Sequence, residues 1–109
     1  MDDDDAVFKA LADPTRRRIL DALRDRDGQP LSELEALIGK ETGMSRYGVM
    51  KHLKVLGAAG LVTTERRGRQ TLHHLHPVPI RLLHDRWISK YTVTQVAALS
   101  DLKRRLEGS

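Results

Sequence analysis

The sequence predicts a mainly α-helical fold with one two-stranded β-hairpin. Most of the chain repeats apolar residues at the three- and four-residue spacing of amphipathic helices, whereas residues 61–76 alternate β-branched and polar residues around a glycine. The chain has 109 residues, of which 39% are hydrophobic and 31% are charged, a composition typical of a folded protein. We therefore expect residues 1–109 to form a single domain.

The Asp13-Pro14 pair separates the first two predicted helices. Apolar residues at helical spacing predict a short helix over residues 6–12 and a second helix over residues 14–26. The Asp13 side chain can cap the second helix, and Pro14 suits the first helical position because its missing N–H has no partner there.

Residues 32–60 are predicted to form two helices joined by a turn. Ser32 and Glu35 have the spacing of a capping box, so the first helix is expected to begin at Ser32 and to end at Gly39. Ser45 is then the expected N-cap of the second helix, which runs to the end of this segment.

The remaining elements are the hairpin and a C-terminal helix. The hairpin over residues 61–76 is expected to turn at Arg67-Gly68, because glycine tolerates a tight turn. The helical period returns over residues 79–107. The β-branched residues 92–94 leave open whether this segment is one helix or a bent helix pair.

Basic residues are concentrated in the middle of the chain, whose net charge is +4. Residues 1–44 contain seven basic and eleven acidic residues, whereas residues 45–81 contain seven basic residues and one acidic residue. A localised basic patch of this kind indicates a surface that binds a polyanion.

The helix that follows Ser45 has the pattern of a DNA recognition helix. Placing Val49, Leu53 and Leu56 against the core turns the opposite side of this helix outward. That outward side carries apolar and basic residues, namely Tyr47, Met50, Lys51 and Lys54. Such a helix suits the major groove, where basic side chains donate to phosphates or to guanine.

Three arginines, Arg66, Arg67 and Arg69, lie at the tip of the predicted hairpin. A capped helix, a recognition helix and a basic hairpin in this order form the winged helix-turn-helix arrangement, in which the wing lies along the DNA backbone or enters the minor groove. For each basic element taken alone, the alternative is a polar surface that faces solvent and binds no partner.

The chain contains, in this order, the segments FKALADPTRRRIL, LSELEALIG, SRYGVMKHLKVLGAAGLV and RRGRQTLHHLHP. Together these segments resemble the ArsR family of winged-helix transcriptional repressors over nearly the whole chain. The resemblance implies a homodimer that pairs through its first and last helices and binds an imperfect palindrome in double-stranded promoter DNA. It implies DNA contacts at Ser45, Arg46, Tyr47, Lys51 and His52 in the recognition helix and at Arg67 and Arg69 in the wing. The other predicted DNA-binding residues of these two elements are Lys54, Arg66 and Gln70. One departure is the turn segment GKETGM, which is a few residues longer than the family's usual turn.

The first and last helices carry more apolar surface than one small domain is expected to leave exposed. The predicted dimer interface consists of Val7, Phe8, Leu83, Trp87, Tyr91, Leu99, Leu102 and Leu106. The alternative for these residues is packing within the core of a single chain.

The histidines raise the question of a metal site, because many members of the ArsR family sense metals. The chain has no cysteine, so the family's cysteine site is absent, and the C-terminal segment lacks the Asp and His spacing of the second known class. His74 and His76 could share one face of a strand, with a third ligand from His84, Asp85 or the partner subunit. We expect packing and proximity to phosphate instead, and hence neither a metal nor a cofactor.

Other function classes find little support. No nucleotide-binding, serine-hydrolase or zinc-protease motif is present, so we do not expect an enzyme. The acidic N-terminus differs from a signal peptide and no apolar run is long enough to span a membrane, so a cytoplasmic location is expected.

The leading hypothesis is a homodimeric, sequence-specific repressor that occludes a promoter. One alternative is a sensor repressor that uses the wing and C-terminal histidines to bind a metal or a small-molecule effector of unknown identity. A second alternative is a winged-helix module that binds a protein partner.

Overall fold

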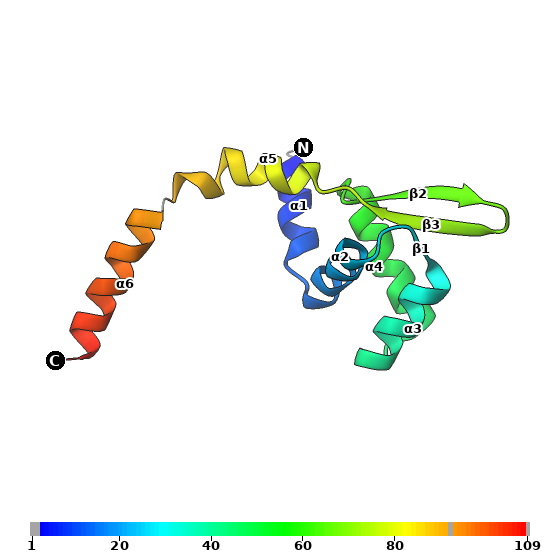
Figure 1. Ribbon diagram of the computed structural model, residues 1–109, viewed down its shortest axis with the longest axis horizontal. Helices are drawn as coiled ribbons and strands as arrows, with labels where there is room; N and C mark the ends of the chain where they lie inside the picture. Colours follow the sequence, from blue (N-terminus) through cyan, green and yellow to red (C-terminus); the bar gives the residue numbers. More distant parts are fainter. Residues whose placement is uncertain (1–2, 92, 109) are drawn as a thin grey trace.

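The computed structural model describes residues 3–91 and 93–108. The elements in chain order are α1 (Asp3–Leu11), α2 (Pro14–Asp25), β1 (Gln29–Pro30), α3 (Leu31–Thr42), α4 (Arg46–Ala58), β2 (Val62–Arg67), β3 (Gln70–Leu75), α5 (Val78–Arg86), the 3-10 helix η1 (Ile88–Lys90) and α6 (Val93–Glu107) (Figure 1). This is a mainly helical winged helix-turn-helix fold, and the predicted fold class is confirmed.

The junction between α1 and α2 depends on polar caps on both helices. The Asp13 carboxylate accepts hydrogen bonds from the backbone N–H groups of Thr15 (2.8 Å) and Arg16 (3.1 Å), which confirms the predicted cap. In return, the Arg16 and Arg17 guanidinium groups donate to backbone carbonyls at the C-terminal end of α1. Each helix therefore has polar partners for backbone groups that its own hydrogen bonds leave unpaired.

The predicted capping box at Ser32 is wrong. Helix α3 begins at Leu31, and its N-cap residue is Pro30, whose side chain makes no capping hydrogen bond. The start is set by β1, because Pro30 pairs with Leu72 of β3 immediately before the helix.

The predicted end of the third helix at Gly39 is also wrong. Helix α3 continues through Gly39 to Thr42 and ends at Gly43, whose backbone has a positive φ of 74°. The Glu41 carboxylate on this added turn pairs with Arg18 of α2 (2.8 Å). The extra residues of the GKETGM segment therefore mainly lengthen α3, and a short connection leads to α4.

The wing has three strands, not the two that the sequence predicted. The order in the antiparallel sheet is β1-β3-β2, with Gln29 opposite His73 and Val62 opposite Leu75. The buried Gln29 side chain explains why the short strand forms here, because its amide donates to the carbonyls of Ala22 (2.9 Å) and Arg26 (2.7 Å). This edge strand joins the base of the wing to the end of α2.

The apolar core lies between α1 to α5 and the base of the sheet. Its buried residues are Val7, Ala10, Ile19, Leu20, Ala22, Leu23, Leu34, Ile38, Val49, Leu53, Leu56, Leu61, Val62 and Leu83. These residues recur at the helical spacing found in the sequence, and they hold α4 with one side inward and one side free.

The C-terminal segment corresponds to the bent helix pair. Helix α5 ends at Arg86, η1 follows, and α6 points away from the helical body (Figure 1). The predicted bend near residues 92–94 includes Thr92, which lies outside the described residues. No helix in the described part of the chain is long and apolar enough to cross a membrane.

Candidate nucleic-acid interface

Helix α4 has one buried side and one exposed side. Val49, Leu53 and Leu56 are buried as predicted, whereas Tyr47 and Met50 are 70% and 47% exposed. Lys51 and Lys54 are exposed on the same outward surface, and the Lys51 ammonium lies 5.4 Å from the centre of the Tyr47 ring. The outward side thus combines cations with apolar surface, as major-groove contacts require.

The start of α4 is fixed by a side-chain cap. The Ser45 hydroxyl oxygen accepts the backbone N–H of Gly48 at 3.2 Å, as the sequence predicted. The other first-turn N–H groups remain available to an anion such as a phosphate. Arg46 follows the cap, and its Nε lies 3.6 Å from a carboxylate oxygen of Glu35 on α3.

The wing tip presents exposed arginines around a tight turn. Gly68 has a positive φ of 58°, and its carbonyl accepts a hydrogen bond from Arg66 (3.0 Å). Arg67 donates to the Glu65 carboxylate (2.7 Å), whereas the guanidinium of Arg69 has no carboxylate within ion-pair distance among the described residues. The predicted wing residue Gln70 is exposed beside them.

The two predicted DNA-binding elements lie next to each other. A hollow of about 240 Å³ is lined by residues from both, including Arg46 of α4 and Arg69 and Gln70 of the wing. A second hollow, of about 370 Å³, lies between Met50 and Lys54 of α4 and Thr64 and Thr71 of the wing. The recognition helix and the wing are therefore neighbours, and cations from both elements surround a mainly apolar floor between them.

A third hollow, of about 550 Å³, lies on the outward side of α4. Its lining consists of Arg16, Tyr47, Met50, Lys51, His52, Lys54 and Val55. Within it, an Arg16 nitrogen lies 3.3 Å from Nδ1 of His52. Sequence reasoning missed Arg16, because it belongs to α2 and is far from α4 in the sequence.

Comparisons with known proteins agree with this geometry. Residues 11–65 match the family model described as a helix-turn-helix domain. Over 86 residues the chain is 44% identical to the HTH-type transcriptional regulator YuzN of Bacillus subtilis (strain 168), covering 77% of this chain and 94% of the relative.

Two further comparisons extend this result. The chain is 33% identical to the transcriptional repressor SdpR of Bacillus subtilis (strain 168), over 64% of this chain and 72% of the relative. A crystal structure of an ArsR family transcriptional regulator superimposes with a TM-score of 0.58 at 30% identity, covering 96% of this chain and 90% of that chain. The chain belongs to the ArsR family of helix-turn-helix transcriptional regulators.

In this ArsR-family protein, His74 of the wing lies between two carboxylates. Its Nδ1 is 3.0 Å from Asp27 and its Nε2 is 3.2 Å from Glu65. The Asp27 carboxylate raises the pKa of His74, and the backbone N–H of Leu75 is the main cause that lowers the pKa of Asp27. His74 therefore stabilises the base of the wing through contacts within the chain.

The other histidines have surroundings different from those of His74. His73 is buried, with Nδ1 3.1 Å from the carbonyl oxygen of Gln29, while His84 lies on α5 beside Asp85. The described residues contain no group of three or more histidines, aspartates and glutamates positioned to hold a metal ion.

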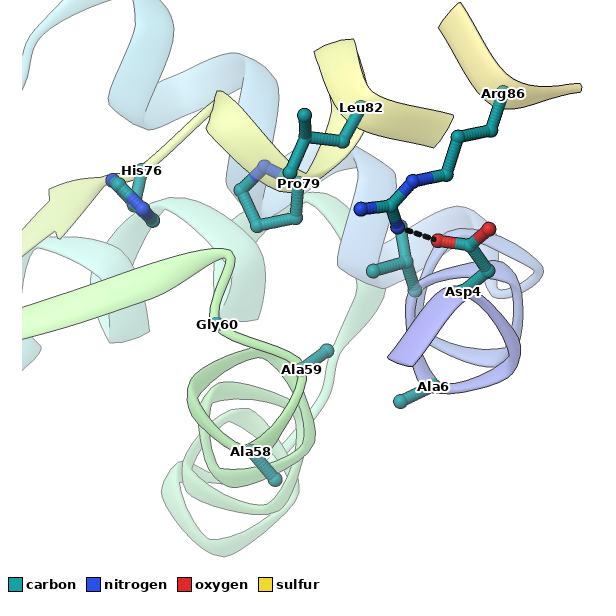
Figure 2. A pocket seen from close by; sticks show the side chains of 10 residues that line it. Asp4, Ala6, Ala58, Ala59, Gly60, His76, Pro79, Leu82 and Arg86 are labelled. Atoms are coloured by element: carbon teal, nitrogen blue, oxygen red, sulfur yellow. Dashed lines mark hydrogen bonds and ion pairs between the residues drawn. The ribbon is translucent and has the colours of Figure 1, made fainter. Parts of the chain in front are cut away.

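His76 lines a pocket of about 350 Å³ between α1, the end of α4 and α5 (Figure 2). Small side chains form much of its wall, including Ala58 and Ala59. At its other end Arg86 of α5 pairs with Asp4 of α1 at 3.0 Å. This ion pair joins α1 to α5 on the side of the molecule that carries the predicted dimer residues.

The predicted dimer residues divide into two groups. Val7 and Leu83 are 3% and 1% exposed, so their inclusion in a dimer surface is wrong because they pack in the core of the single chain. The other six are exposed, namely Phe8, Trp87, Tyr91, Leu99, Leu102 and Leu106. Among these, the ring of Trp87 packs edge-on against Phe8 and Tyr91, with centroid distances of 5.6 and 5.2 Å.

Proposed function

We propose that the protein is a homodimeric repressor that binds a palindromic operator in promoter DNA and blocks transcription. The main support is that the outward side of α4 and the wing lie next to each other and both present exposed cations. A surface of this shape and charge complements a major groove and the phosphate backbone beside it.

The two elements have different roles in this proposal. Arg46 and Lys51 of α4 donate to phosphates or to guanine, and the ring of Tyr47 contacts apolar parts of the bases. In the wing, Arg67 and Arg69 contact the backbone or enter the minor groove. Ser45 contributes by ordering the first turn of α4, where backbone N–H groups favour an anion.

A homodimer accounts for the exposed apolar residues. The aromatic cluster of Phe8, Trp87 and Tyr91 joins α1 to the end of α5, and its members are 39%, 45% and 58% exposed. Helix α6 adds four exposed apolar residues, Val96, Leu99, Leu102 and Leu106. Pairing these surfaces across a two-fold axis would bring two copies of α4 to successive major grooves, about 34 Å apart.

Repression is the direction of regulation that the relatives favour. SdpR, at 33% identity, is named a transcriptional repressor. A dimer seated on a promoter excludes other proteins from the same DNA, so binding alone is sufficient for repression.

The test is a titration of a DNA fragment from the protein's own promoter region, followed by fluorescence anisotropy. We expect two subunits per site and an affinity far above that for shuffled DNA of the same composition. The double variant Lys51→Ala with Arg69→Ala should weaken binding, whereas Arg24→Ala, an exposed arginine of α2, serves as the matched control. Equal affinity for promoter and shuffled DNA would refute operator recognition.

A further inference from the structure

We propose that Arg16 is a positioning residue for DNA binding: its contact with Nδ1 of His52 selects the neutral form of the ring that carries its proton on Nε2, so that α4 offers DNA a fixed N–H donor. This inference rests on the proposed function, because it assigns His52 a contact with DNA.

The Arg16 guanidinium is itself held in place by α1. Its Nε donates to the carbonyl of Ala10 and its Nη2 donates to the carbonyl of Lys9, both at 2.8 Å. These carbonyls belong to the last turn of α1, where the regular partners four residues ahead are missing, and the Lys9 carbonyl also accepts the backbone N–H of Ala12 at 3.3 Å. Two bonds in one plane fix the orientation of the guanidinium group and leave Nη1 to point elsewhere.

Nη1 of Arg16 lies 3.3 Å from Nδ1 of His52. Guanidinium only donates hydrogen bonds, so this contact is favourable only when Nδ1 carries a lone pair. The proton of the neutral ring is then on Nε2. The alternative neutral form, with the proton on Nδ1, would set two N–H groups against each other and lose the bond.

The location of His52 makes this choice relevant to DNA. The half-buried His52 ring lines the hollow on the outward side of α4, together with Tyr47 and Lys51. Its charged neighbours from α2 are Arg16 and Asp13, the residue that caps α2. A ring whose proton is already on Nε2 can donate to a phosphate oxygen or a base acceptor without first converting from its other neutral form. Binding then carries a smaller free-energy cost.

Arg17 provides a matched control. Its Nη1 donates to the carbonyl of Leu11 at 2.7 Å, so it also caps the end of α1. Among the described residues, Arg17 makes no hydrogen bond to α4. Arg16→Gln and Arg17→Gln therefore both weaken the same helix cap, and only Arg16→Gln removes the contact with His52.

The first measurement is long-range proton–nitrogen NMR of the histidine rings in the free protein. We expect His52 to carry its proton on Nε2 in the wild type and in Arg17→Gln, and to become a mixture of the two neutral forms in Arg16→Gln. A His52 that keeps its Nε2 proton in Arg16→Gln would overturn the proposal. If Arg16→Gln does not fold, Arg16→Lys replaces it, because lysine can still bond one carbonyl.

The second measurement is a double-mutant cycle on affinity for the promoter DNA. Arg16→Gln should weaken binding about three- to tenfold when His52 is present, the range expected for one directed hydrogen bond, and less than about twofold in a His52→Ala background. Equal losses in both backgrounds would show that Arg16 acts through the fold alone and would overturn the proposal. If the wild type does not bind the DNA, the proposed function fails, while the NMR result still decides whether Arg16 sets the state of His52.

Discussion

Replacing Arg69 by alanine should flatten the dependence of log K for operator binding on log salt by about two units. Each phosphate that a protein cation neutralises contributes about 0.9 to this slope, because binding releases the counterion that the phosphate had condensed. A homodimer presents Arg69 twice, so the substitution removes two such contacts. Arg69 is a good choice because its side chain is exposed and lies beside Arg46 at the junction of the wing and α4.

The slope of the wild type follows from the charges on the two elements. Among the described residues of α4 and the wing, four cations of each protomer have no carboxylate within ion-pair distance, and these are Lys51, Lys54, Arg66 and Arg69. If all eight in the dimer contact phosphate, the slope is about −7, and Arg69→Ala lowers its magnitude to about 5. Between 50 and 200 mM salt the variant should then lose about tenfold less affinity than the wild type.

The assay is anisotropy on the promoter fragment at four or more salt concentrations. Arg24→Ala should leave the slope unchanged, which controls for the general effect of losing one positive charge. Glu65→Gln should steepen the slope, because the carboxylate at 2.7 Å then no longer offsets the charge that Arg67 brings to the DNA backbone. A slope for Arg69→Ala equal to that of the wild type would refute the assignment of the wing to the DNA backbone.

Three further predictions concern stability and assembly. The Asp27 carboxylate raises the pKa of His74 in the folded protein. The stabilising contact is therefore complete below the unfolded pKa, about 6.5, and is lost as the pH rises through the folded pKa. Urea unfolding at pH 6 and pH 8.5 should show a larger loss of stability for the wild type than for His74→Gln. Gln29→Ala should lower the free energy of unfolding by about 1–3 kcal/mol, because two carbonyls lose a buried donor. As a control, Gln70→Ala at an exposed position should change it by less than about 0.5 kcal/mol. An equal effect of both substitutions would contradict the role of β1 in joining the wing to α2. Trp87→Ala should shift the protein toward monomer in sedimentation at micromolar concentration, and an unchanged dimer would exclude the aromatic cluster from the interface.

The sequence was sufficient to predict the helices with strong periodicity and clear caps. Asp13 and Ser45 form the expected caps, and the buried side of α4 is the predicted one, because a short polar side chain before an apolar stripe has few other structural uses. The start of α3 was mistaken because Ser32 and Glu35 fit a capping box, whereas pairing of Pro30 with the wing decided where the helix begins. A strand of two residues has no period to detect, so β1 could be found only from the structure.

The sequence also limited what could be known of the candidate site. Local patterns were enough to select the residues of α4 and the wing, because each lies within one short element. Partners from distant elements could not be selected, and these include Glu35 beside Arg46, Asp27 beside His74 and Arg16 beside His52. The division of the dimer residues had the same cause: Val7 and Phe8 are neighbours in α1, and only the packing of the folded chain decided that Val7 is buried and Phe8 is exposed.

The three-stranded sheet links the wing to the rest of the DNA-binding surface. A two-stranded hairpin held only at its base can pivot. Its arginines would then lose conformational entropy when they bind the DNA backbone. In this protein β1 pairs with β3, and the side chain of Gln29 bonds the end of α2. Asp27 adds bonds to the backbone N–H of Leu75 (2.7 Å) and to the ring of His74 (3.0 Å), so the wing is attached to the end of α2 along its inner strand. Of the histidines in the sequence QTLHHLHPVPIRLLHD, His73 and His74 therefore help to fix the base of the wing, and in the proposed function the phosphate contacts of the wing fall to the arginines at its tip.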